Sequence, residues 1–174
     1  MIYVYGMTTI FLTAIPLSLL GEFNPFLFVI AIFSFYLAIA GYRQGRDKSG
    51  AREQIDKVLG FFITATGILF YAMAVGAYLI EDSTWIPSVL FGTIALIFGI
   101  NDFRRMKILD RPNFYDRTNL HLNLMLGGTI ATTTAFIVTI EPFSTFWLNW
   151  VAPTIVVTPV IGYFSKRELA KKIN

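Results

Sequence analysis

The sequence predicts an all-α membrane protein, a bundle of six transmembrane helices arranged as three hairpins, with the N- and C-termini on the cytoplasmic side. Of its 174 residues, 55% are hydrophobic and only 14% are charged, which is too apolar for the surface of a soluble domain. Apolar runs of roughly 18 residues or more recur along the chain, and each could cross about 30 Å of hydrocarbon as a helix. Membrane lipid is therefore the expected partner of most of the surface.

The distribution of charge predicts the orientation of the spans. Every lysine and arginine lies in one of three segments, residues 43–57, 104–117 and 166–172. The intervening turns contain only acids among their charged residues, namely Glu22, Glu81, Asp82 and Glu141. Because cytoplasmic loops of membrane proteins are enriched in cations, we expect the basic segments inside and the acidic turns outside. A nucleic-acid partner is not expected, since that would need a folded basic face.

The chain is expected to form a single integral membrane domain with spans at about residues 2–20, 25–42, 58–80, 87–102, 119–140 and 147–164. The residues after Met1 show neither a basic leader nor a small-residue cleavage pattern, so the first run is interpreted as a retained span. Pro25 suits the first position of a helix and begins the second span. This span is rich in phenylalanine with almost no polar atoms, and we expect it to be the most lipid-exposed helix.

The remaining spans carry further local signals. Small and hydroxylated residues in span 3, such as Thr64, Thr66 and Gly67, usually mark helix contacts. Asp116 or Thr118 could cap the start of span 5. Span 6 contains two prolines, which should bend it or leave backbone carbonyls without an intrahelical donor.

Helical spacing places five residues of span 5 on one stripe running from the cytoplasmic interface toward the midplane. They are Arg117, His121, Met125, Gly128 and Thr132. A histidine about one turn inside the membrane loses hydration, so it should face protein or water. The candidate partners near the same depth are Asn101, Asp102, Asp116 and Asn119.

Two interpretations of His121 stay open. In the first, a small polar pocket opens to the cytoplasm and is built on spans 4 and 5, with span 6 beside them. In the second, His121 only anchors the end of its helix by hydrogen bonding to a loop carbonyl or to Asp116. The threonines of spans 5 and 6 have a similar ambiguity, since they could line a path for a ligand. We expect them instead to bond to their own helix backbone and to fill close contacts.

Several kinds of chemistry are excluded or disfavoured. The chain has no cysteine, which excludes disulfides, iron–sulfur clusters and thiolate catalysis. It has one histidine, so bis-histidine haem ligation would need a second copy, and His121 with Met125 on one helix cannot reach both faces of a porphyrin. The motifs of soluble enzymes, including phosphate loops and GxSxG, are missing. We therefore expect no cofactor and lean against an enzyme, with haem or quinone binding at His121 as an alternative.

The leading functional hypothesis is a small transporter, channel or ligand-binding protein for a neutral, amphipathic or anionic ligand. Its pocket is expected between spans 3, 5 and 6, with His121 as a pH-sensitive hydrogen-bonding group and Arg117 as an anion contact. The full set of expected ligand-binding residues is His121, Arg117, Met125, Thr132, Asn101 and Asp102.

Two alternatives belong to other classes. One is a redox or lipid-modifying membrane protein that uses His121 for a quinone or haem, or the carboxylates Asp102, Asp110 and Asp116 at the cytoplasmic surface. The other is a structural or partner-binding subunit. The expected location is the cytoplasmic membrane of a bacterium, and a homo-oligomer is compatible with the pattern.

Overall fold

The protein is all-helical, with six helices in the part of the chain that the computed structural model describes, residues 2–20, 25–46, 54–107 and 114–173. The helices are α1 (Ile2–Leu20), α2 (Pro25–Arg46), α3 (Gln54–Leu79), α4 (Trp85–Lys107), α5 (Phe114–Ile140) and α6 (Phe146–Ile173). Five of them, α2 to α6, are long and apolar enough to cross a membrane. The sequence-based prediction of a helical membrane protein is confirmed at this level.

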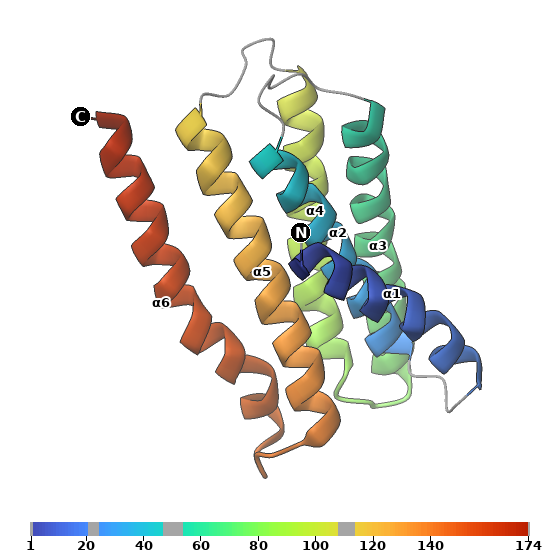
Figure 1. The fold of residues 1–174 in the computed structure, drawn as a ribbon. Helices are drawn as coiled ribbons and strands as arrows, with labels where there is room; N and C mark the ends of the chain where they lie inside the picture. Colours follow the sequence, from blue (N-terminus) through green and yellow to red (C-terminus); the bar gives the residue numbers. More distant parts are fainter. Residues whose placement is uncertain (1, 21–24, 47–53, 108–113, 174) are drawn as a thin grey trace.

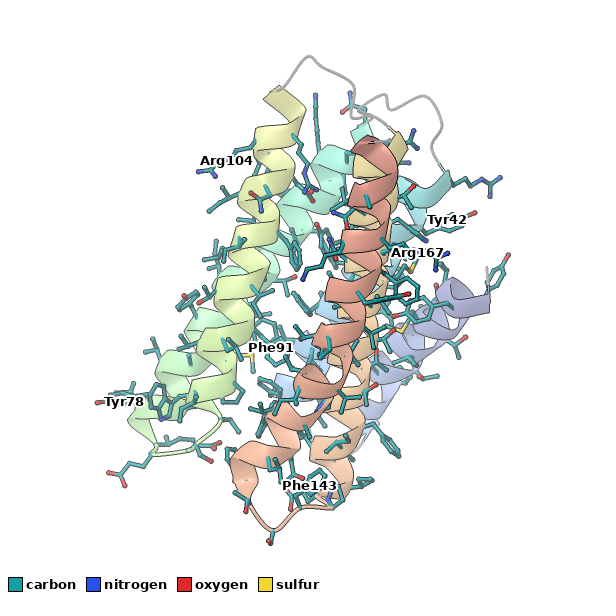
Figure 2. The ribbon with its side chains drawn as sticks, turned by 90° about the vertical axis from the view of Figure 1, so that its left-hand side faces the viewer. Tyr42, Tyr78, Phe91, Arg104, Phe143 and Arg167 are labelled. Carbon is teal, nitrogen blue, oxygen red and sulfur yellow. The ribbon has the colours of Figure 1, made fainter. Side chains whose placement is uncertain are left out.

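The helices differ from the predicted spans chiefly at one end of the bundle. There α2, α4 and α6 end later than expected, and α3 and α5 begin earlier. Apolar composition sets the length that lipid can cover, whereas the hydrogen-bonded helix continues into charged sequence. Figure 1 shows these ends together at the top of the view, and Figure 2 labels Arg104 and Arg167 there. We call it the basic end, and the opposite end, with Tyr78 and Phe143, the acidic end.

Helix α2 lies at the centre of the packing. It packs along α5 and also contacts α1 and α3, while α3 packs along α4 and α5 packs along α6. Figure 1 shows α1 crossing the bundle obliquely, and Figure 2 shows the same tilt from the side. The helix at the other edge, α6, is the least buried of the five apolar helices.

The expectation that the second span faces lipid is wrong. Helix α2 is the most buried of the five apolar helices, and it supplies more than half of the hydrophobic core, from Phe26 to Ala40. The error has a physical cause. Lipid tails are as apolar as leucine, so hydrophobicity cannot distinguish a lipid-facing helix from a central one. The informative residues were the small ones, Ser34, Gly41 and Gly45, which permit close approach of neighbours.

An aromatic cluster joins α2, α3 and α4 in the core. Phe26 and Phe33 of α2 contact Phe70 of α3 and Phe91 of α4, with ring centroids 5.7–6.4 Å apart in edge-on or tilted geometry for these pairs. Phe70 and Phe91 also stack on each other at 5.8 Å. Such pairs are favourable because the positive edge of one ring meets the negative face of another.

The acids at the acidic end terminate helices. Glu81 has φ 57° and Glu141 has φ 45°, a left-handed conformation that glycine usually adopts after a helix. The Asp82 N–H donates to the Ala77 carbonyl at 2.9 Å and the Glu81 N–H to the Tyr78 carbonyl at 3.2 Å, closing α3 with a Schellman motif. The Glu141 N–H donates to the Ile137 carbonyl at 2.9 Å. Each of these turns is therefore fixed by backbone bonds.

We expect Phe70→Ala to destabilise the protein by about 3 kcal/mol, the lower end of what such core truncations cost. Phe70 is fully buried, and the loss would come from contacts within the aromatic cluster rather than from transfer to water. The matched control is Phe61→Ala on the same helix, because Phe61 is 71% exposed. Thermal unfolding in detergent or nanodiscs would compare the two. Equal melting temperatures would contradict a central α2–α3–α4 core.

Candidate functional site

The imidazole of His121 lies against the last turns of α2. Its Nδ1 is 2.6 Å from the carbonyl oxygen of Gly41. A Cβ built on Gly45 would come within 2.8 Å of the same Nδ1. The ring therefore fits beside α2 because Gly45 lacks a side chain, and one turn earlier the bare Gly41 leaves room for Leu124 and Met125. This contact resembles the second interpretation, in which His121 anchors the end of its helix through a loop carbonyl. Here the carbonyl belongs to helix α2 instead of a loop.

Arg117 closes the same end of α2. Its side chain is buried, and Nη2 donates to the carbonyl of Gln44 at 3.3 Å. The last four carbonyls of a helix have no intrahelical donor and carry partial negative charge. A guanidinium placed there satisfies one of them and interacts favourably with the helix dipole. Arg117 and His121 together bind α5 to the C-terminal turns of α2.

The deeper part of the α5 stripe is covered by α1. The Tyr3 hydroxyl donates to the Met125 carbonyl at 3.3 Å and lies 3.5 Å from the Thr129 hydroxyl. The Thr132 hydroxyl donates to the Gly128 carbonyl at 3.0 Å and lies 3.4 Å from the Met7 sulfur. The stripe, defined as Arg117, His121, Met125, Gly128 and Thr132, thus forms one face as predicted. Its neighbours are α2 and α1.

Asp102 belongs to a different cluster. The hydroxyl of Tyr36, on α2, donates to Asp102 Oδ2 at 2.6 Å, and Arg105 Nη1 is 3.9 Å from Oδ1. Asn101 is half-buried on the same turn of α4. The six expected ligand-binding residues therefore separate into two groups, four on the face of α5 that meets α1 and α2 and two on α4, where Asp102 bonds to α2. Asp102 was one candidate partner for His121. In the structure each of the two residues instead forms a hydrogen bond with α2.

The expected walls of the pocket also differ from the structure. We expected spans 3, 5 and 6 around the site, but within the described residues α3 and α5 do not pack together. The reason is the central position of α2, which contacts both of them. Of the two expected neighbours, only α6 packs along α5. Between these two helices, the Ser165 hydroxyl donates to Asn123 Oδ1 at 3.2 Å.

An ion pair at the basic end was missed by sequence reasoning. Arg43 donates from Nε and Nη2 to the two oxygens of Asp56, at 3.2 and 3.1 Å. This two-pronged geometry links α2 to α3 and is stronger than a single contact. Spacing along one helix says nothing about a partner on another, so the sequence did not indicate this pair. Tyr36 was missed for the same reason, although a phenol in an apolar span was a visible signal.

The threonines of α5 mostly behave as expected for packing residues. Thr129, Thr132 and Thr139 each donate to the carbonyl four residues earlier in the helix, at 2.8–3.0 Å. The expected bonding to their own helix backbone is confirmed for these three. Thr134 is different, because its hydroxyl is buried and has no partner among the described residues.

The described residues contain no group of three or more histidine or carboxylate side chains that could hold a metal ion. Asp110 lies outside the described residues, and the side chain of Asp116 is likewise not described. Since Nδ1 of His121 is engaged by Gly41, a haem iron or quinone would have to use Nε2. Cofactor binding at His121 stays a prediction.

The comparisons with known proteins identify no relative. No protein-family model matches the chain, and no match is found among curated proteins or solved structures. The function must therefore be argued from the site alone.

We expect Gly45→Ala to destabilise the α2–α5 contact, because the added Cβ would displace the imidazole from Gly41. The control is Gly76→Ala, since a Cβ at Gly76 meets nothing within 4 Å. Alanine in place of glycine stabilises a helix by about 0.5–1 kcal/mol at either position. The difference in stability between the two variants therefore isolates the clash with His121. Thermal unfolding of the two variants measures it. A Gly45→Ala variant as stable as Gly76→Ala would mean that His121 does not pack there.

Proposed function

We propose that the protein is a small integral membrane transporter, channel or ligand-binding protein whose site is the α5 stripe between α1 and α2. The observation that carries the proposal is the polarity of this one face. It begins with a buried guanidinium and an imidazole at the basic end and continues through Thr129 and Thr132 into the apolar part of the bundle. Polar residues inside membrane segments commonly mark ligand pathways.

The contacts of α1 support access to this face. The Tyr3 hydroxyl reaches its two partners at 3.3 and 3.5 Å, and Thr132 reaches Met7 at 3.4 Å. The two oxygen–oxygen distances lie at the weak end of hydrogen-bond geometry, and the contact of Thr132 with the Met7 sulfur is a weak one because a thioether is a weak acceptor. A ligand hydroxyl could replace Tyr3 at Met125 and Thr129 with little loss. Displacement of α1 would then expose the stripe.

The chemistry of the face favours a neutral or anionic ligand with an apolar body. Arg117 and His121 offer positive or hydrogen-bonding groups, and no residue of the stripe is acidic. Met7, Met125 and Leu124 supply apolar surface around them. A cationic ligand would meet the guanidinium without a compensating carboxylate on the stripe, so it is disfavoured.

The orientation forms part of the same proposal. The basic end would face the cytoplasm, with the helices joined as three successive hairpins and both termini on the cytoplasmic side, in the cytoplasmic membrane of a bacterium. The support is the confinement of all lysines and arginines to three segments, which follows the positive-inside rule.

A second candidate is a structural or partner-binding subunit. It is favoured by the hydrogen bonds of His121 and Arg117 to backbone carbonyls of α2. In this case the stripe serves as a helix contact and never meets a ligand. The two candidates differ in one property, which is whether water reaches the stripe.

The chain lacks cysteine, so single-cysteine variants can test the topology without a background signal. We expect an impermeant maleimide added outside intact cells to modify the Ser83→Cys and Ser144→Cys variants. The Lys166→Cys variant should react only in inside-out vesicles. All three side chains are exposed, so access to the reagent depends on the side of the membrane. Modification of Ser83→Cys and Lys166→Cys from the same side would contradict the proposed orientation.

The same chemistry tests the site. We expect the Thr132→Cys variant to react with a charged thiol reagent added to inside-out vesicles, because thiolates form and react only where water reaches them. The control is Phe136→Cys, one turn along α5, where the native side chain is 62% exposed and would face lipid. If both variants stay unmodified, the stripe is dry, which would leave the structural candidate in place of ligand binding.

A further inference from the structure

The side of α6 that faces away from the bundle carries polar groups. Thr154 and Thr158 lie one turn apart on this helix, and both are exposed. Helix α6 is the least buried of the five apolar helices, and Figure 1 shows it at the edge of the bundle. Residues 147–164 include both threonines and contain no charged residue. The two hydroxyls therefore belong to the part of α6 that hydrocarbon would surround.

The hydroxyls of Thr154 and Thr158 differ from those of other exposed threonines in the helices. Four such threonines donate to the carbonyl four residues earlier in their own helix, at 2.8–3.0 Å, namely Thr9, Thr13, Thr93 and Thr139. This bond satisfies a hydroxyl that would otherwise face lipid. Within the described residues, the side-chain hydroxyls of the two α6 threonines make no hydrogen bond. Hydrocarbon supplies no acceptor in place of the missing one.

A backbone acceptor lies beside these two donors. Proline has no N–H, so Pro159 removes the intrahelical donor of the Ile155 carbonyl, four residues earlier. Ile155 and Pro159 are both exposed, which places the freed carbonyl on the outer side of α6. Pro153, the other proline within the helix, is buried, so its effect falls on the side toward the bundle. The outer side of α6 thus combines two donors with one acceptor.

These groups form one face of the helix at one depth. At about 100° and 1.5 Å per residue, Thr154, Ile155 and Thr158 fall within about 100° around α6 and about 6 Å along it. Pro159 adjoins them, and we call these four residues the outer α6 face. Gly162 extends the same side by one turn, and a Cβ there would meet nothing within 4 Å. The face therefore offers both hydrogen-bonding roles, with room for a neighbouring helix to approach.

We propose that two copies of this chain form a two-fold symmetric dimer in the membrane through their outer α6 faces. Copies inserted in the same direction have parallel α6 helices, so Thr154 and Thr158 of one copy lie at the depth of the Ile155 carbonyl of the other. The threonine hydroxyls of each copy donate to that carbonyl of the second copy. Threonine forms such interhelical bonds in lipid, and two-fold dimers are the commonest homo-oligomers.

A second copy is the occupant that the chemistry of the outer α6 face favours. Lipid chains have neither donors nor acceptors, so they would leave both hydroxyls and the carbonyl unsatisfied. A helix with only donors or only acceptors would satisfy part of the face, whereas the same face on a second copy matches it group for group. The dimer is independent of the function proposed for the α5 stripe, because the exposed outer α6 face takes no part in the packing of α6 along α5.

Disulfide crosslinking can locate the interface, because the chain has no cysteine of its own. We expect the purified Ile155→Cys variant to give a crosslinked dimer when it is oxidised in lipid vesicles. The matched control is Val156→Cys, which should stay monomeric, since Val156 is 70% exposed but points about 100° away around the helix. Equal crosslinking of the two variants, or none at Ile155→Cys, would overturn the proposal. So would an Ile155→Cys product that forms only in native membranes and has the mass of a complex with another protein.

The hydrogen bonds are tested by removing the donors and the acceptor separately. The double variant Thr154→Val with Thr158→Val removes both hydroxyls and keeps the side-chain shape, and Pro159→Ala supplies the missing N–H to the Ile155 carbonyl. We expect each change to raise the dissociation constant of the dimer about tenfold, as the loss of one or two interhelical bonds implies. Single-molecule photobleaching in vesicles at decreasing protein density measures it. The control Thr139→Val should leave the constant unchanged, since Thr139 bonds to its own helix. A dimer as stable in both test variants as in the parent protein would contradict the proposed contact.

Discussion

The close approach of α5 to α2 is the constraint on which the rest of the structure depends. Within a bilayer, helices gain little from leaving lipid, so association relies on packing and on interhelical hydrogen bonds. A Cβ on Gly41 would lie 3.1 Å from Leu124, and one on Gly45 would lie 2.8 Å from His121. The absence of these side chains brings the backbone of α2 within reach of an imidazole. With α2 held in this way, α1 and α3 pack on its remaining surface and α4 reaches it through aromatic contacts.

Four polar contacts at the basic end join α2 to its neighbours. His121 and Arg117 bind its carbonyls from α5, Asp56 pairs with Arg43 from α3, and Asp102 accepts from Tyr36 across to α4. The cations at this end therefore have two kinds of role. Arg104 and Lys166 are exposed at the surface, whereas Arg43 and Arg117 join helices. The charge pattern alone cannot separate these roles.

Sequence reasoning predicted the helices well because apolar length and helical spacing are properties of one segment. It also predicted the membership of the α5 stripe, since residues three and four apart share a face in any helix. It did not predict which helices would cover that stripe, or that Tyr36 would reach Asp102. Those facts depend on how separate helices pack, and phenylalanines look alike whether they face lipid or a core. The small residues of α2 carried the missing signal.

Polar residues lie on two flanks of α5, and the hydrogen bonds on these two flanks differ in length and in partner. On the flank toward α2, His121 and Arg117 have short or charge-assisted bonds to backbone carbonyls, which favours a fixed contact. Further along that flank the Tyr3 hydroxyl of α1 lies 3.3 and 3.5 Å from its two oxygen partners, and the buried Thr134 hydroxyl has no hydrogen-bond partner among the described residues. The oxygen–oxygen contacts of α5 with α1 are thus longer than the bond of His121 to α2. Exchange of a protein contact for water loses least where the existing bond is weak, so the contacts of α5 with α1 would exchange more readily than those of His121 and Arg117 with α2.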